Sequence, residues 1–234
     1  MKKTKLFAFA LISFIAVNLV SCSSDDDAAA EPTPNAPSEF DYYPSAINNQ
    51  WVYIVNGTTQ PPLKMVSYDL VNGNNYFTFG AQAGSAASAT TRIRKSGSDY
   101  YSRMETITTQ PSGTTPGTST TGTEFILLKD NLPVNDTWHE IYSQTTSYTN
   151  GAAPITTDYD VTSKIIAKDI SYTVGGITYT NVIKMQRATS YSNSLGSGYS
   201  SSYYWFSKGV GPIRIETITG FGTTNQELAS HIIN

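Results

Sequence analysis

Short runs of β-branched and aromatic residues recur along this chain, and each run stops at a cluster of turn-forming residues. The run from Gln50 to Val55, for example, ends at Asn56-Gly57, a dipeptide that tolerates the positive φ of a tight hairpin turn. Runs and turns at this spacing are typical of consecutive antiparallel strands. We therefore predict an all-β fold, an antiparallel meander of about ten strands that forms a sandwich or an open half-barrel.

The strand pattern extends from residue 50 almost to the end of the chain. The segments that carry it are residues 50–55, 63–71, 76–79, 90–95, 100–108, 124–129, 138–148, 156–168, 170–174, 177–191, 203–207 and 212–219. Residues 225–233 fit either a strand or a short helix. The apolar alternation slips by one position near Asn181, which a β-bulge would explain. Gly196-Ser197-Gly198 is expected to be a turn, and the low-complexity residues 110–122 a mobile, exposed loop.

The first 39 residues differ in composition from the rest of the chain. Three lysines precede an apolar run of fifteen residues, and a helix of that length rises only about 22 Å against a bilayer core of about 30 Å. This combination predicts a cleaved secretory signal peptide rather than a membrane span. The Pro-rich stretch that follows cannot build a core and should be disordered. The predicted organisation is a signal peptide (1–21), a tether (22–39) and a single β domain (40–234).

Leu19-Val20-Ser21-Cys22 resembles the lipobox of bacterial lipoproteins, in which the cysteine thiol receives a diacylglycerol. Cys22 is therefore the predicted site of lipid attachment. Because it is the only cysteine in the chain, no disulfide and no thiolate metal site can form.

The residues after Cys22 resemble the acidic export tag of Bacteroidota lipoproteins. The expected export signal comprises Ser24, Asp25, Asp26 and Asp27. The resemblance implies a lipid-anchored protein of the outer membrane that faces the cell exterior. The alternative is an acidic, solvated beginning of the tether with no role in sorting.

Three motifs in the mature chain resemble a family of Bacteroidota lipoproteins. They are Tyr43-Pro44 with Gln50-Trp51-Val52-Tyr53, the LPVNDTW motif at 132–138 and the YWFSKGVGPI motif at 204–213. The resemblance covers most of the mature chain and implies a β-rich fold similar to the open half-barrels of LolA-type lipoprotein carriers. It implies no activity, because the matching aromatic, Gly and Pro residues serve turns and cores.

Aromatic residues are the best sequence-level indication of a binding surface, since the chain has 16 tyrosines and 3 tryptophans. An exposed aromatic platform could stack on sugar rings or line a groove for an acyl chain. The hypothetical ligand-binding residues are Trp51, Tyr53, Tyr203 and Trp205. The alternative is ordinary core filling, because Trp and Tyr bury large areas while their polar tips stay hydrogen-bonded.

Catalytic and metal-binding motifs are absent from the sequence. His139 and His231 are the only histidines and lack partners at metal-ligand spacing, so we expect them on the surface. Asp158 and Asp160 would share one face of a strand at about 7 Å, within the range of glycosidase carboxylates, although such residues also protect strand edges. The polar cluster formed by Asp130, Asn131, Asn135 and Asp136 matches no calcium-binding loop and is predicted to form turns.

Charge excludes one class of partner. Removal of the leader changes the formal net charge from −3 to −6, because three lysines are lost, and no basic stripe remains to bind nucleic acid. We expect no catalytic residues, no metal and no cofactor other than the lipid on Cys22. The expected function is a membrane-tethered domain that binds an apolar or glycan ligand or an envelope partner. A carbohydrate-active hydrolase and a purely structural or adhesion component are the alternatives, and the oligomeric state stays open.

Overall fold

The computed structural model of the chain describes residues 40–80, 87–88 and 90–234. The predicted leader, the lipid-attachment residue Cys22, the export residues Ser24, Asp25, Asp26 and Asp27, and the tether all lie outside these residues. The described part of the chain contains no helix, and so none with the length and apolar character needed to cross a membrane.

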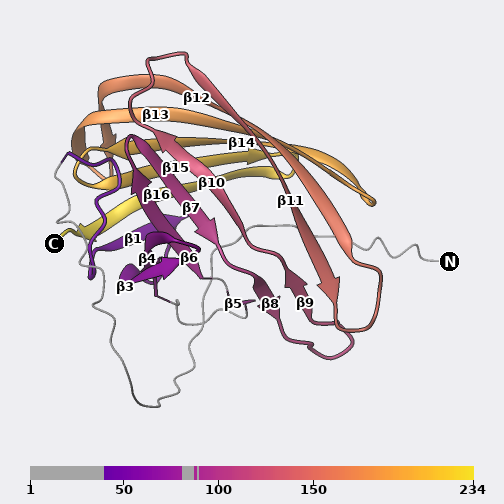
Figure 1. Cartoon of the computed structure of the whole chain (residues 1–234). Helices are drawn as coiled ribbons and strands as arrows, with labels where there is room; N and C mark the ends of the chain where they lie inside the picture. Colours follow the sequence, from indigo (N-terminus) through magenta and orange to yellow (C-terminus); the bar gives the residue numbers. More distant parts are fainter. Residues whose placement is uncertain (1–39, 81–86, 89) are drawn as a thin grey trace, which may run out of the picture.

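Sixteen strands account for most of the described residues (Figure 1). They are β1 (Gln50–Val55), β2 (Thr58–Thr59), β3 (Leu63–Val71), β4 (Asn74–Phe79), β5 (Ala87–Ser88), β6 (Thr91–Ser96), β7 (Asp99–Met104), β8 (Ile107–Thr109), β9 (Thr118–Thr120), β10 (Thr123–Lys129), β11 (Thr137–Tyr148), β12 (Ile155–Val174), β13 (Ile177–Asn193), β14 (Gly196–Ser207), β15 (Gly211–Thr219) and β16 (Gly222–Ile232). The predicted all-β class is confirmed.

The strands pair antiparallel into one sheet in the order β10-β7-β6-β4-β3-β1-β16-β15-β14-β13-β12-β11-β9-β8-β5, with β2 added beside β1. The sheet folds over at β1, which pairs with β3 through Gln50 and Trp51 alone. As a result, strands β3, β4, β6, β7 and β10 lie across strands β12–β16 (Figure 1). The path has two ends, so the predicted open, antiparallel architecture is confirmed.

The core lies between the two parts of the sheet. Trp51 is fully buried at their junction, where its ring packs edge-on against Tyr43 at a centroid distance of 5.4 Å. Its indole Nε1 donates to the backbone carbonyl of Val210 at 2.7 Å. Gly211 follows with φ of 106°, a conformation that favours glycine, and a Cβ there would lie 3.2 Å from the same Nε1. The turn after β14 therefore packs directly against the Trp51 indole.

The outer edge of β10 meets side chains instead of another strand. The N–H of Ile126 donates to Glu140 Oε1 at 2.8 Å, and its carbonyl accepts from Arg187 Nη1 at 3.3 Å. The Arg187 guanidinium also lies 4.1 Å from the centre of the Phe125 ring. Since the Glu140 and Arg187 side chains are only 17% and 8% exposed, a largely buried charge pair closes this edge.

The bulge predicted at Asn181 is confirmed. The pairing of β12 with β13 shifts register between Ile170 and Tyr172, where two residues of β13 stand opposite one of β12. Asn181 itself has φ of 52°, in the left-handed region that Asn tolerates better than most residues. Residues 225–233, left open between strand and helix, belong to strand β16 as far as Ile232.

Two sequence-based expectations are wrong. Residues 110–122 are not a loop throughout, because Thr118–Thr120 form β9 between β8 and β11. The threonines of this tract supply β-branched side chains, and hydroxyl pairs such as Thr120 with Thr146, 2.9 Å apart, link the strands. Gly196-Ser197-Gly198 is not a turn either, because β14 begins at Gly196 and the turn falls on Ser194 and Leu195.

Candidate functional site

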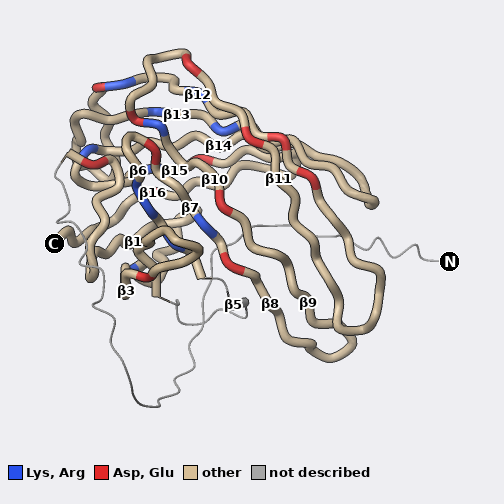
Figure 2. The backbone as a smooth tube through the Cα atoms, viewed as in Figure 1, with Lys and Arg blue, Asp and Glu red and all other residues tan. Residues whose placement is uncertain are grey.

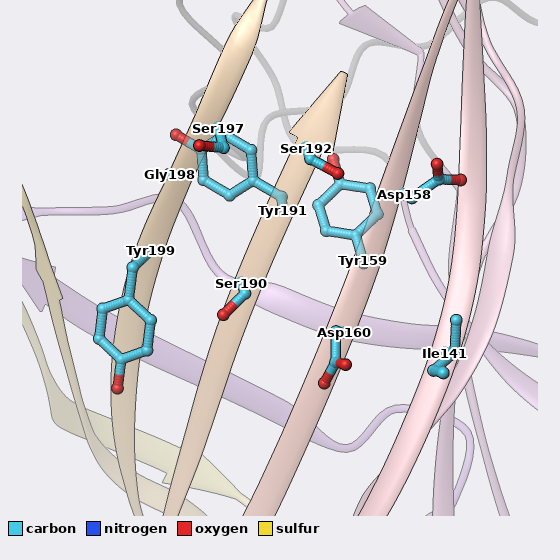
Figure 3. A pocket seen from close by; sticks show the side chains of 10 residues that line it. All are labelled: Ile141, Asp158, Tyr159, Asp160, Ser190, Tyr191, Ser192, Ser197, Gly198 and Tyr199. Carbon is cyan, nitrogen blue, oxygen red and sulfur yellow. The ribbon is translucent and has the colours of Figure 1, made fainter.

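A shallow, open groove of about 530 Å³ crosses the four strands β11 to β14 (Figure 3). Its lining residues are Ile141, Asp158, Tyr159, Asp160, Ser190, Tyr191, Ser192, Ser197, Gly198 and Tyr199. The groove lies near the beginning of β12 and β14, where Asp158 is the fourth residue of β12 and Ser197 the second residue of β14.

Strand register explains which side chains meet in the groove. Ile141 pairs with Asp160, Asp160 with Ser190, and Ser190 with Tyr199. Directly paired residues point to the same face of a sheet. A second row, Asp158 with Ser192 and Ser197, lies beside the first on that face. We call this the outer face, because residues of the opposite parity on β13, such as Met185, are buried in the core.

The two groove carboxylates are held by neighbours on β11. Asp158 accepts a hydrogen bond from the Ser143 hydroxyl at 2.6 Å, and Asp160 lies 2.8 Å from Nε2 of His139. The His139 and Asp160 side chains are 51% and 62% exposed, so their interaction is worth little stability. The second carboxylate oxygen of each aspartate has no hydrogen-bond partner among the described residues. These oxygens can therefore accept hydrogen bonds from a ligand.

Exposed apolar side chains flank the polar floor. Ile141 is 70% exposed on one side, and Tyr199 is 54% exposed on the other. Beyond Tyr199 the surface stays uncharged, because residues 188–207 and 217–226 contain no Asp, Glu, Lys or Arg. These ranges form the β13–β14 and β15–β16 hairpin ends, which Figure 2 shows without red or blue segments. The groove thus combines acceptor oxygens and hydroxyls with an aromatic wall, and its own lining includes no cation.

A row of aromatic rings supports the groove from the inner face. Tyr142 stacks on Tyr159 at a centroid distance of 5.0 Å, and Tyr159 lies 6.3 Å from Tyr191. Tyr191 in turn covers Gly198, where a Cβ would come within 2.2 Å of its hydroxyl oxygen. Burial raises the pKa of Tyr159 above its usual range, and the nearby Tyr142 adds to this. Cross-strand aromatic contacts of this kind hold the four strands in register.

Three of the four residues predicted to bind ligand are buried. Trp51 has no exposed surface, and Tyr53 and Trp205 are each 5% exposed. The Tyr53 hydroxyl donates to the carbonyl of Pro212 at 2.9 Å, and burial raises its pKa well above the usual value. The idea of an exposed aromatic platform is therefore wrong for these three residues. Trp51 and Tyr53 fill the core and donate to backbone carbonyls there.

Tyr203, the fourth, is half-buried on the outer face beside Trp205. Lys184 Nζ lies 4.7 Å from the Trp205 ring centre and 5.2 Å from that of Tyr203. Arg214 and Tyr172 also lie against Trp205, with Arg214 Cζ at 5.3 Å and the Tyr172 centroid at 5.2 Å. Cations over the rings, which the sequence pattern could not indicate, bury an otherwise exposed tryptophan.

The remaining sequence candidates are separated by the fold. His231 pairs with Trp51 in β1 and does not approach His139 on β11. Burial lowers the pKa of His231 below its usual value. Asp130 accepts from the Tyr100 hydroxyl at 3.1 Å, and Asn135 has φ of 76°, as expected of a turn residue. Within the described ranges, no group of three or more His, Cys, Asp or Glu could hold a metal ion.

The sequence did not single out the groove as a unit. It proposed Asp158 and Asp160 as a weak acidic pair, and the structure places both in the groove. Ile141, Tyr199 and the serines carried no recognisable motif. The signal that could have found them is the alternation of exposed polar and aromatic residues on neighbouring strands, but this becomes visible only once the register is known.

Comparison with solved structures supports the fold. A protein of Parabacteroides distasonis, described as a lipoprotein, matches 82% of this chain and 98% of its own with a TM-score of 0.54 and 12% identity. An exported protein of Bacteroides fragilis with a YmcC-like fold matches 81% of this chain and 98% of its own, with a TM-score of 0.48 and 9% identity. At 12% identity the first likeness shows a shared fold alone. No family model and no curated protein matches the chain.

Proposed function

We propose that this chain is a lipoprotein anchored in the outer membrane through Cys22 and facing the cell exterior, with a non-catalytic β domain that binds a neutral glycan in the groove. The leader, the lipobox and the acidic residues after Cys22 support the anchoring. The structural neighbour from Parabacteroides distasonis, described as a lipoprotein, is consistent with it.

The observation that carries the ligand class is the make-up of the groove. The free oxygens of Asp158 and Asp160 and the hydroxyls of Ser190 and Ser192 suit the hydroxyl groups of a sugar. The exposed ring of Tyr199 offers a flat surface for the C–H face of a pyranose. No cation lines the groove to pair with an acidic sugar, so a neutral chain fits best. An apolar ligand fits less well, because the carboxylates of Asp158 and Asp160 stand among the lining residues.

The groove lies far from the point where the described domain begins. The carbonyl of Asp41 accepts from the N–H of Gly209, just beyond the end of β14, whereas Tyr199 lies near the start of that strand. The nine residues from Tyr199 to Ser207 extend about 27 Å. This separation supports a groove that is presented away from the tethered end of the domain.

The test is calorimetric titration of the mature chain with a panel of neutral and acidic oligosaccharides. Tyr199→Ala and Asp160→Asn should each weaken binding of a neutral glycan about tenfold, the loss of roughly one good contact. Ile177→Ala is the matched control, because Ile177 is also 54% exposed but lies outside the groove. Absence of binding across the panel would refute the ligand assignment. Anchoring is tested separately, because Cys22→Ala should release the protein from membranes.

A hydrolase is the second candidate, because the fold brings Asp158 and Asp160 into one groove. Two carboxylates on one strand face could act on a glycosidic bond, one as the acid and the other as the base. Release of reducing ends from a bound glycan, abolished by both Asp158→Asn and Asp160→Asn, would support this alternative. Binding without release supports the non-catalytic domain.

A further inference from the structure

The groove ends on one side at Tyr199, and the turn between β15 and β16 follows next to it. The pairing of β14 with β15 ends at Ser200 opposite Thr219. Continuing this register by one residue sets Gly220 opposite Tyr199, and opposed residues in antiparallel strands have Cα atoms about 5 Å apart. The turn therefore continues the outer face one strand beyond the four strands that line the groove.

Gly220 differs from the other glycines of the described ranges. Each of the others either takes positive φ or would place a Cβ within 3 Å of another atom. Gly220 does not take positive φ, and a Cβ there would meet no atom within 4 Å apart from its chain neighbours. Neither the backbone nor the packing thus requires a glycine at this position. A third use of glycine is to let a ligand approach the backbone closely.

Exposed apolar side chains surround Gly220. Ile218 pairs with Ser201, two residues from Tyr199, so it lies on the outer face, where it is 41% exposed. Phe221, the next residue of the turn, is 84% exposed, and its N–H is held by the Thr219 hydroxyl at 3.2 Å. We call Tyr199, Ile218 and Phe221, with Gly220 between them, the turn patch.

We propose that the turn patch is a second subsite, which takes the next ring of the neutral glycan that occupies the groove. This inference rests on the proposed function. The missing side chain of Gly220 lets a sugar ring reach the backbone, while the rings of Tyr199 and Phe221 offer apolar faces to its C–H groups. Residues 188–207 and 217–226 contain no charged side chain, so the patch suits a neutral chain and offers no counter-ion to an acidic one.

The second subsite specifies the length of the ligand. The groove crosses three strand spacings, about 14 Å, and the turn adds about 5 Å. A disaccharide can occupy the groove alone, whereas a longer linear chain reaches the turn patch as well. The ligand class that follows is a linear, neutral oligosaccharide or polysaccharide.

Calorimetric titration with the di- and hexasaccharides of the neutral gluco- and manno-series tests the subsite. The wild-type chain should bind a hexasaccharide at least about tenfold more tightly than the disaccharide of the same series. Phe221→Ala should weaken hexasaccharide binding about fivefold and leave disaccharide binding unchanged. Tyr199→Ala should weaken both, because Tyr199 also lines the groove.

Gly220→Val tests the open space directly. The new side chain should reduce hexasaccharide affinity to about that of the disaccharide. Thermal unfolding should not change, because a Cβ at this position meets no neighbouring atom. Phe40→Ala is the matched control for Phe221→Ala. Phe40 is also an exposed phenylalanine, at 65%, but it lies against Lys208, just beyond the opposite end of β14.

The outcomes separate this inference from the proposed function. Equal affinity for both lengths, or hexasaccharide binding that tolerates Gly220→Val and Phe221→Ala, would overturn the second subsite alone, provided that Asp160→Asn still weakens binding. A chain that binds no glycan would refute both. Flotation with phosphatidylcholine vesicles and sedimentation equilibrium check other occupants of the patch. Vesicle binding or self-association that is lost in Phe221→Ala would overturn the glycan subsite in favour of a lipid surface or a second copy.

Discussion

Arg187 offers the sharpest test of how the two parts of the sheet are held together. We consider Arg187→Met, which keeps an unbranched stem of similar length but removes the guanidinium. The change deprives the Ile126 carbonyl of its donor at 3.3 Å and the Phe125 ring of a cation at 4.1 Å. It also leaves the carboxylate of Glu140 without its cationic partner at 3.9 Å. At the edge of β10, the N–H of Ile126 then keeps its partner Glu140, but the carbonyl of Ile126 has lost its own.

The expected cost follows from these contacts. A hydrogen bond from a charged donor contributes about 1.5 kcal/mol at this longer distance, and the cation–π contact about 1 kcal/mol. Both losses are part of the cost of removing one member of a largely buried charge pair, which is about 3 kcal/mol or more and includes the penalty of leaving Glu140 unpaired. We expect Arg187→Met to lower the free energy of unfolding by about 3 kcal/mol, out of a total of about 10 kcal/mol for a domain of this size.

Urea denaturation of the mature chain measures this loss. Glu140→Gln keeps an acceptor for the N–H of Ile126 and should cost about 1 kcal/mol on its own. In the double variant, neither member of the charge pair is left without its partner. Its loss of unfolding free energy should therefore be smaller than the sum of the two single changes by about 1 kcal/mol. The charge pair does not hold the edge of β10 against β11 and β13 if Arg187→Met lowers the free energy of unfolding by less than about 1 kcal/mol. Strictly additive effects of the two changes would lead to the same conclusion.

Three further predictions concern the core, the bulge and the tyrosines. Trp51→Phe removes the donor to the part-buried carbonyl of Val210 and should cost about 2 kcal/mol in urea denaturation. A loss within about 0.5 kcal/mol would contradict the role of that bond. Asn181→Ala should cost about 1–2 kcal/mol because of the positive φ, whereas Asn181→Gly should be close to neutral. Burial raises the pKa of Tyr43 and Tyr53 in the folded state, so their contribution to stability is complete below the unfolded value of about 10 and is lost as the pH rises above it. Tyrosinate absorbance should show a class of tyrosines that ionise only on alkaline unfolding, and smooth titration of all tyrosines in the folded protein would refute this.

Local sequence determined most strand positions, because turn chemistry acts over two to four residues. Asn56-Gly57 was predicted as a turn, and its two residues take positive φ of 46° and 84°. The same dipeptide type at Asn72-Gly73, between β3 and β4, also takes positive φ, 51° and 78°. Such turns require φ values that Gly and Asn adopt at low cost, so the sequence alone marks where a hairpin reverses. Asn181 shows the same logic within a strand, since the slip in alternation and the residue type together located the bulge.

The identity of the exposed face was decided only by the tertiary structure. The alternation of a strand shows which residues share a face, but which face is covered depends on how distant segments pair and curve. Trp205 illustrates this, because Lys184 and Arg214 from the adjacent strands bury it on a face where Tyr199 stays exposed. The groove has the same origin: Ile141 and Tyr199 are 58 residues apart in the sequence and line one groove, on β11 and β14, only through long-range register. Turns act locally and can be predicted from a few residues, whereas a surface assembled from several strands exists only after the chain has folded.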